Sequence, residues 1–152
     1  MPRLFRWIPA TGGRRLRSAD RSIDDRGGVA IEFAIVGPLL LVMVFGILSY
    51  GGYFWLSHSI QQLANDAARS ALAGLSANER QQLAQSTMQS EIGSYGMLSS
   101  SYATTTVSSQ TDSMTVSVSY NGAGTPFWSM DAVIPMPPQT ITRSATIKLA
   151  GF

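Results

Sequence analysis

The stretch that decides the fold is residues 26–56, RGGVAIEFAIVGPLLLVMVFGILSYGGYFWL. After Arg26 it contains one charged residue, Glu32, and the next charge is Asp66. Residues 33–56 number 24, and as an α-helix they would extend about 36 Å, enough to cross a bilayer with some tilt. Pro38 lies about one turn inside and is expected to kink or loosen this helix locally. The sequence therefore predicts one membrane-spanning helix with a carboxylate at its start.

The two ends of this helix differ in charge. Seven of the eleven basic residues precede Gly27, whereas residues 28–152 carry four basic and six acidic residues, a side-chain charge of −2. Arginines beside one end of a span hold that end in the cytoplasm. At the other end lies an aromatic cluster typical of a membrane interface, Tyr50, Tyr53, Phe54 and Trp55. A secretory signal peptide fits poorly, because the apolar segment is too long and no small-residue cleavage site follows directly.

A helical period continues beyond the apolar segment. One face carries residues at spacings of three and four: Ile60, Leu63, Ala64, Ala67, Ala68, Ala71, Leu72 and Leu75. We expect the long helix to end near Ala73, with Gly74 in the left-handed conformation. Ser76 and Glu79 form a capping box that opens a second helix, which ends at Gly93 and Gly96. Its apolar side comprises Leu83, Thr87, Met88, Ile92 and Tyr95.

From residue 102 onward the composition changes to Ser, Thr and Val, and alternation replaces the helical period. We expect strands at 102–108, 114–120 and 140–149, with a turn at 109–112. The last strand would place Arg143 on one face with apolar residues. The predicted fold class is α+β: a long N-terminal transmembrane helix continuing as an amphipathic helix, a second short helix and a small antiparallel β-sheet. The predicted parts are a basic leader at 1–27, the long helix at 28–75 and an α+β domain at 76–152.

The chain lacks the motifs of the common enzyme and ligand classes. It has no cysteine, no Gly-rich phosphate loop and no histidine pair, and its single histidine, His58, reads as a polar residue at the membrane interface. The acids after Glu32 are scattered, and Trp128, in a Pro-rich loop, is expected to fill the core. We therefore predict no enzyme, cofactor, metal, nucleic acid or small-molecule substrate. The arginines of the leader account for the basic charge.

A glycine, four further residues, a glutamate, an aromatic residue and an apolar helix form a pattern that resembles the processing site of type IV prepilins. Gly27, Glu32 and Phe33 occupy these places, and cleavage would fall between Gly27 and Gly28. The Glu32 carboxylate of one cut subunit could then meet the terminal ammonium of a neighbour, so that two costly burials become one ion pair. Alternatively, Glu32 stays at the cytoplasmic interface of an uncut anchor and reaches water.

The resemblance extends beyond the cleavage motif. It covers residues 25–40, DRGGVAIEFAIVGPLL, then Gly46 and Tyr50, and residues 66–69, DAAR, while the tail at 140–145 is similar to family endings. On these residues the chain resembles the TadE-like family, pilin-like proteins (pseudopilins) of the Tad or Flp tight-adherence pilus system. Phe33 departs mildly from the family, in which tyrosine is common there.

The resemblance implies partners and a location. The partners would be a prepilin peptidase, other Tad pilin-like subunits, inner-membrane platform proteins and membrane lipid. The N-terminus would be cytoplasmic and the C-terminal domain periplasmic, with incorporation in the pilus open. Major Flp pilins are shorter and mostly helical, so the sheet favours a minor pilin or pseudopilin that acts in pilus assembly, adhesion and biofilm formation. The alternatives are an uncleaved single-pass inner-membrane adaptor of the same machine and, least supported, a membrane-anchored enzyme.

Overall fold

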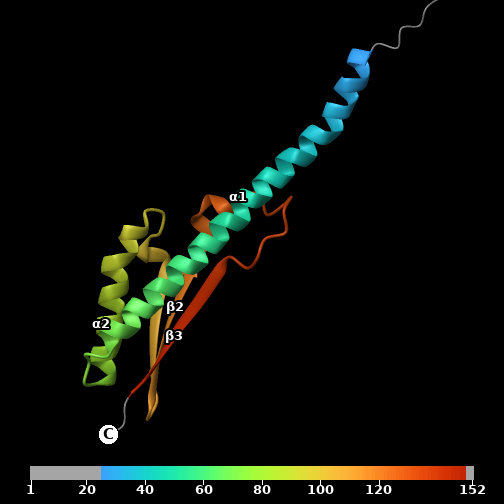
Figure 1. Ribbon diagram of the computed structural model, residues 1–152. Coiled ribbons are helices and arrows are strands. Elements are labelled where there is room, and N and C mark those ends of the chain that lie inside the picture. The colour runs from blue at the N-terminus through green and yellow to red at the C-terminus, as the bar shows by residue number, and fades with distance from the viewer. Residues whose placement is uncertain (1–24, 150–152) are drawn as a thin grey trace, which may run out of the picture. The chain divides into compact units, whose positions relative to one another are not determined.

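The computed structural model describes residues 25–149, so the predicted leader lies almost wholly outside the described residues. The described chain opens with one long helix, α1, Asp25–Ala71 (Figure 1). Pro38 lies inside α1 without ending it. The chain divides within α1 into two units, one ending at Val36 and one beginning at Gly37, and each is described by itself. The prediction of one continuous helix through the apolar segment is confirmed.

The C-terminal end of α1 differs from the prediction. The helix ends at Ala71, and its last carbonyls accept short-range bonds from Leu72, Ala73 and Gly74, each to the residue three positions earlier. Because these tight turns satisfy the carbonyls, no left-handed residue is required. Gly74 accordingly lacks a positive φ, so that prediction was wrong. Gly74 matters for space instead: a Cβ there would lie 2.7 Å from the backbone nitrogen of Arg80.

The second helix, α2, Ala77–Glu91, starts as predicted. The Glu79 backbone N–H donates to Ser76 Oγ at 3.2 Å, and the Ser76 N–H donates to Glu79 Oε2 at 3.1 Å. These reciprocal bonds form the capping box. A short 3-10 turn, Ile92–Tyr95, continues the chain, and Gly96 follows it with a φ of 60°, a conformation that favours glycine.

The remaining elements form a three-stranded antiparallel sheet in the order β1-β2-β3. The strands are β1, Ala103–Ser109; β2, Ser113–Asn121; and β3, Thr140–Lys148. Each lies within one residue of its predicted bounds at either end. The α+β fold class is therefore confirmed. The long connection between β2 and β3 contains two short 3-10 turns, the second of which is η4, Pro126–Trp128.

Helices α1 and α2 pack against one face of the sheet, and the core lies between the helices and that face. Fully buried side chains include Leu56, Ile60 and Leu63 of α1, and Val116 and Val118 of β2. Leu72 and Leu75 were predicted on the same buried face, but they are exposed, because the helix itself ends at Ala71 although the helical period of the sequence continues. The predicted division of the chain at residues 75 and 76 stays a prediction.

The other face of the sheet is a surface of hydroxyl groups. Neighbouring strands are joined across it by three side-chain bonds, Thr115 to Thr146, Ser117 to Ser144 and Thr142 to Ser119, at 2.9, 2.9 and 3.1 Å. At the outer edge of β1, the Gln81 side chain donates to Thr105 O and accepts from Val107 N–H, both at 2.8 Å. A side chain of α2 therefore occupies part of the edge of β1.

Candidate processing and assembly site

The predicted cleavage site lies in the first turns of α1. The helix begins at Asp25, so Gly27 and Gly28 are both helical, and both are exposed. A Cβ built at either glycine would meet nothing within 4 Å. Each glycine costs a helix about 1 kcal/mol relative to alanine. The peptide bond between them thus lies in an accessible turn that is easily unwound.

Glu32 and Phe33 lie on one stripe of this helix. They line a shallow hollow of about 240 Å³ together with Val29 and Val36, at the spacings i, i+3, i+4 and i+7 that define a single helical face. Phe33 is 74% exposed. The carboxylate is therefore set among apolar side chains, on a face to which another helix could pack.

Gly28 and Glu32 are four residues apart in the same helix, and such residues lie above one another on one face. If the chain were cut after Gly27, the new ammonium at Gly28 and the carboxylate of Glu32 would lie one turn apart. Two opposite charges on one stripe could pair within a subunit or between subunits with an axial offset. The structure brings the four predicted residues onto adjacent turns of one helix.

The family comparison covers these residues. Residues 27–69 match the family model described as TadE-like protein. The predicted resemblance is confirmed. The matched segment begins at Gly27, includes Gly28, Glu32 and Phe33, and continues into the part of α1 that packs against the sheet. No curated protein and no solved structure matches the chain.

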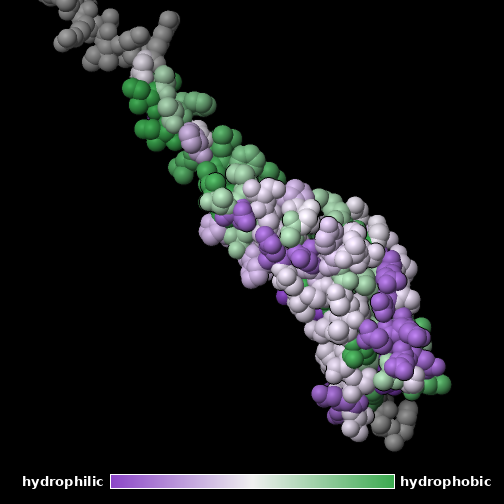
Figure 2. Space-filling view, turned by 180° about the vertical axis from the view of Figure 1, so that it is seen from behind, coloured by the Kyte–Doolittle hydropathy of each residue, from purple (hydrophilic) through white to green (hydrophobic). Residues whose placement is uncertain are grey.

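The TadE-like match indicates involvement with the Tad pilus system, and it suggests other pilus components as partners. The family is not known for enzymatic activity. Helix α1 is long and apolar enough to cross a membrane. Figure 2 shows hydrophobic side chains around the N-terminal part of α1 and paler or hydrophilic ones over much of the remaining surface.

A second cluster, which the sequence did not predict, fastens the β2–β3 connection to α1. Gly52 is buried against the Phe127 ring, and a Cβ at Gly52 would overlap that ring. The Tyr50 hydroxyl donates to the Pro135 carbonyl oxygen, and Tyr53 packs edge to face on Trp128 at 6.0 Å between ring centroids. Tyr50 and Tyr53 were predicted to belong to an interfacial belt. They are only partly exposed because they hold this loop.

Trp128 is buried in the core, as predicted, and its Nε1–H donates to Pro137 O at 2.9 Å. Arg143 shares its face with apolar residues, also as predicted, and its Nη2–H donates to Ser57 Oγ on α1 at 2.8 Å. A glycine in an apolar helix often marks a place where another segment packs closely on the helix backbone. Gly52 was therefore the available signal that the β2–β3 connection packs on α1. Its partner, 75 positions away in the sequence, had no such signal.

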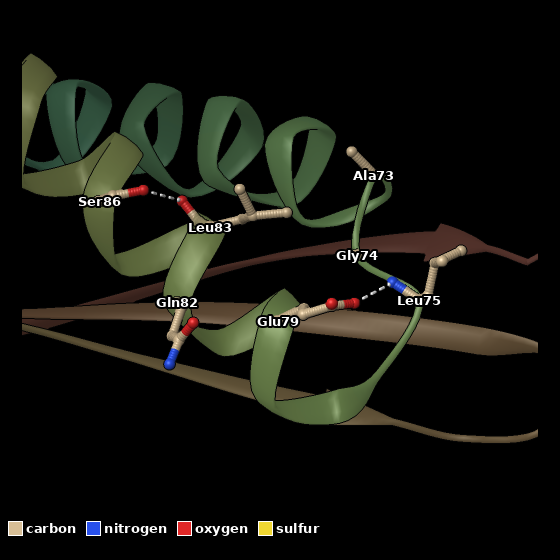
Figure 3. Close-up of a pocket in the computed structure, with 7 residues that line it drawn as sticks. All are labelled: Ala73, Gly74, Leu75, Glu79, Gln82, Leu83 and Ser86. Carbon is tan, nitrogen blue, oxygen red and sulfur yellow. Dashed lines mark hydrogen bonds between the residues drawn. The ribbon is translucent and has the colours of Figure 1, made fainter.

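A hollow of about 540 Å³ lies at the corner between α1 and α2 (Figure 3). Its charged lining residue, Glu79, accepts from the Leu75 and Ser76 N–H groups at 2.8 and 3.1 Å. These bonds lower the pKa of Glu79. The carboxylate is therefore committed to the helix cap. Among the described residues, no group of three or more His, Cys, Asp and Glu side chains could hold a metal ion.

Proposed function

We propose that this protein is a minor pilin or pseudopilin of a Tad/Flp (type IVc) pilus, cleaved after Gly27 by a prepilin peptidase. The observation that carries the proposal is the family match at 27–69, which begins at the glycine of the predicted cleavage site. In this proposal the N-terminus is cytoplasmic and the sheet is periplasmic. The processed subunit acts in pilus assembly, adhesion and biofilm formation, together with other pilin-like subunits and inner-membrane platform proteins.

The stripe of Val29, Glu32, Phe33 and Val36 supports an assembly role for Glu32. A carboxylate on an apolar helical face is costly when a neighbouring helix covers it, unless a cation lies opposite. The new ammonium at Gly28 of a neighbouring subunit would be that cation. The pair would favour one axial register between helices and disfavour others.

One observation favours a second candidate function, an uncleaved inner-membrane adaptor. Helix α1 begins before Gly27, so the helix runs through the proposed scissile bond without a break. An intact anchor would need no other conformation there. In that case Gly27 and Gly28 would be ordinary residues of the first helical turns.

The N-terminal residue and the intact mass of the protein distinguish these functions. We expect protein from native membranes to begin at Gly28 when the candidate peptidase is present and to be full length when it is absent. Gly27→Leu should block processing, because the peptidase would have to accept a large side chain at the cut.

Gly46→Leu is the matched control for this experiment. Both glycines lie in α1, and a Cβ at either meets nothing within 4 Å, so both substitutions add the same bulk to open space. The control should be processed normally. Full-length parent protein in cells that contain the peptidase would exclude the cleaved subunit and support the adaptor.

A further inference from the structure

The exposure of α1 changes after Leu48, where the folded domain begins to cover one face of the helix. Large hydrophobic side chains are exposed from Val29 to Leu48, whereas the next residue, Ser49, is only 5% exposed. About 20 residues of helix suffice to cross the hydrocarbon core of a bilayer. The exposed part of α1 therefore has the length of a span. In the remainder of the predicted span, Ser49, Gly52 and Leu56 are buried against the folded domain, whereas Phe54 and Trp55 are 64% and 40% exposed.

The β2–β3 connection meets α1 where one face of the helix becomes covered. Phe127 packs on Gly52, and the Tyr50 hydroxyl donates to Pro135 O. The connection also has internal bonds that fix its shape, such as Ile134 N–H to Met130 O at 2.8 Å. It is thus held at a fixed level along α1.

An apolar groove of about 420 Å³ opens at this level, and we call it the Phe127 groove. Two elements line it: Phe45, Leu48 and Ser49 of α1, and Pro126, Phe127, Ser129 and Met130 of the connection. None of these side chains is charged, and only the two serines are polar. Phe45 and Leu48, which form one wall, belong to the exposed apolar part of α1, at 41% and 61% exposure.

We propose that the Phe127 groove holds a lipid acyl chain, and that the η4 segment rests in the membrane interface on the side away from the leader. One wall of the groove belongs to the exposed apolar part of α1, so a bilayer that solvates Phe45 and Leu48 also reaches the opposite wall. Val133 of the same connection suits this location, because its apolar side chain is 59% exposed. The inference rests on the membrane placement of α1 in the proposed function.

Single-cysteine labelling tests the inference, since the chain has no cysteine of its own. Ser129→Cys and Met130→Cys place a nitrobenzoxadiazole probe at the groove. Leu40→Cys places it in the span, and Thr111→Cys places it in the exposed β1–β2 turn at the other end of the sheet. The full chain is reconstituted in phosphatidylcholine–phosphatidylglycerol vesicles that contain lipids with doxyl groups near the headgroup or deep in the chain.

We expect the probes at 129 and 130 to be quenched by the shallow doxyl lipid several-fold more than the probe at 111, which iodide in the water should quench instead. Quenching at position 40 but not at 129 or 130 would overturn the groove while leaving the span intact. No quenching at position 40 would overturn the membrane placement itself. Probes at 129 and 130 that are shielded from both doxyl lipid and iodide would mean that protein covers the groove, and would also overturn the inference.

Discussion

Glu32 is the acidic residue on which the proposed assembly role depends. It lies on the same stripe as Val29, Phe33 and Val36, so its carboxylate has apolar side chains on both sides along the helix. A carboxylate in that position is stabilised little by the surrounding hydrocarbon and strongly by a nearby cation. The contribution of Glu32 to assembly therefore depends on which group packs against this stripe.

We expect Glu32→Gln to leave membrane insertion intact and to impair pilus assembly, because the amide keeps the shape of the side chain but loses the charge. Losing one partner of a buried ion pair costs about 3 kcal/mol, or on the order of 100-fold in association. Electron microscopy of pili and cell fractionation provide the two measurements. Asp112→Asn, which neutralises an exposed acid in the β1–β2 turn, is the control. Normal piliation of the Glu32 variant would contradict the charge pair.

Glu79 makes a pH-dependent contribution to stability. The N–H bonds from Leu75 and Ser76 lower the pKa of Glu79 in the folded protein, so the carboxylate stabilises the fold above its unfolded pKa. That contribution is lost as the pH falls through the folded pKa. We expect Glu79→Gln to melt below the parent at neutral pH and to approach it in acid, as followed by circular dichroism in detergent.

Glu91→Gln is the control for the capping box. Glu91 is the last residue of α2, where the helix dipole disfavours a carboxylate, so this substitution should be neutral or slightly stabilising at neutral pH. A difference between the Glu79 variant and the parent that is the same at neutral and acid pH would exclude the charged cap as its cause.

At the scale of elements, α1 does two different things along its length. Up to Leu48 its large side chains are exposed, and from Leu56 to Ala71 one face of it forms the core with the sheet. The change between the two takes place at Gly52, where the missing Cβ lets the Phe127 ring approach the helix backbone. Adjacent Gly51 has open space around it, and it provides a matched comparison.

We expect Gly52→Ala to destabilise the folded protein by about 1 to 3 kcal/mol, because the added methyl group displaces a packed ring. Gly51→Ala should instead be neutral, or should stabilise the helix by up to about 1 kcal/mol. Near-ultraviolet circular dichroism of full-length protein during thermal unfolding measures both. Combining Gly52→Ala with Phe127→Ala should show strong coupling. Equal effects of the two alanines would show that the ring does not seat on Gly52.

Local signals in the sequence predicted most of these elements. The hydrophobic run and its period predicted α1, Ser76 and Glu79 predicted the start of α2, and alternation predicted the three strands to within a residue. Such features depend on neighbours a few positions away. The end of α1 was missed because leucines at 72 and 75 continue the helical period after the backbone has left the helix.

For the molecule as a whole, the sequence predicted the helices and strands well, and it predicted the contacts that join them much less well. The pairing of Gly52 with Phe127, and of Gln81 with the edge of β1, joins segments that are 75 and about 25 positions apart. Such contacts leave no periodic trace. The four candidate residues between Gly27 and Phe33 could be predicted from the sequence because they lie within seven consecutive positions.

The packing of Phe127 on Gly52 also fixes the rotational position of the folded domain around the axis of α1. Four attachments, at Tyr50, Gly52, Tyr53 and Ser57, hold the sheet and its connection to α1, so the domain cannot swivel around the helix axis. Each residue of an α-helix advances by about 100°. A partner that binds the helix just before Ser49 in one orientation therefore also fixes the direction in which the hydroxyl face of the sheet points.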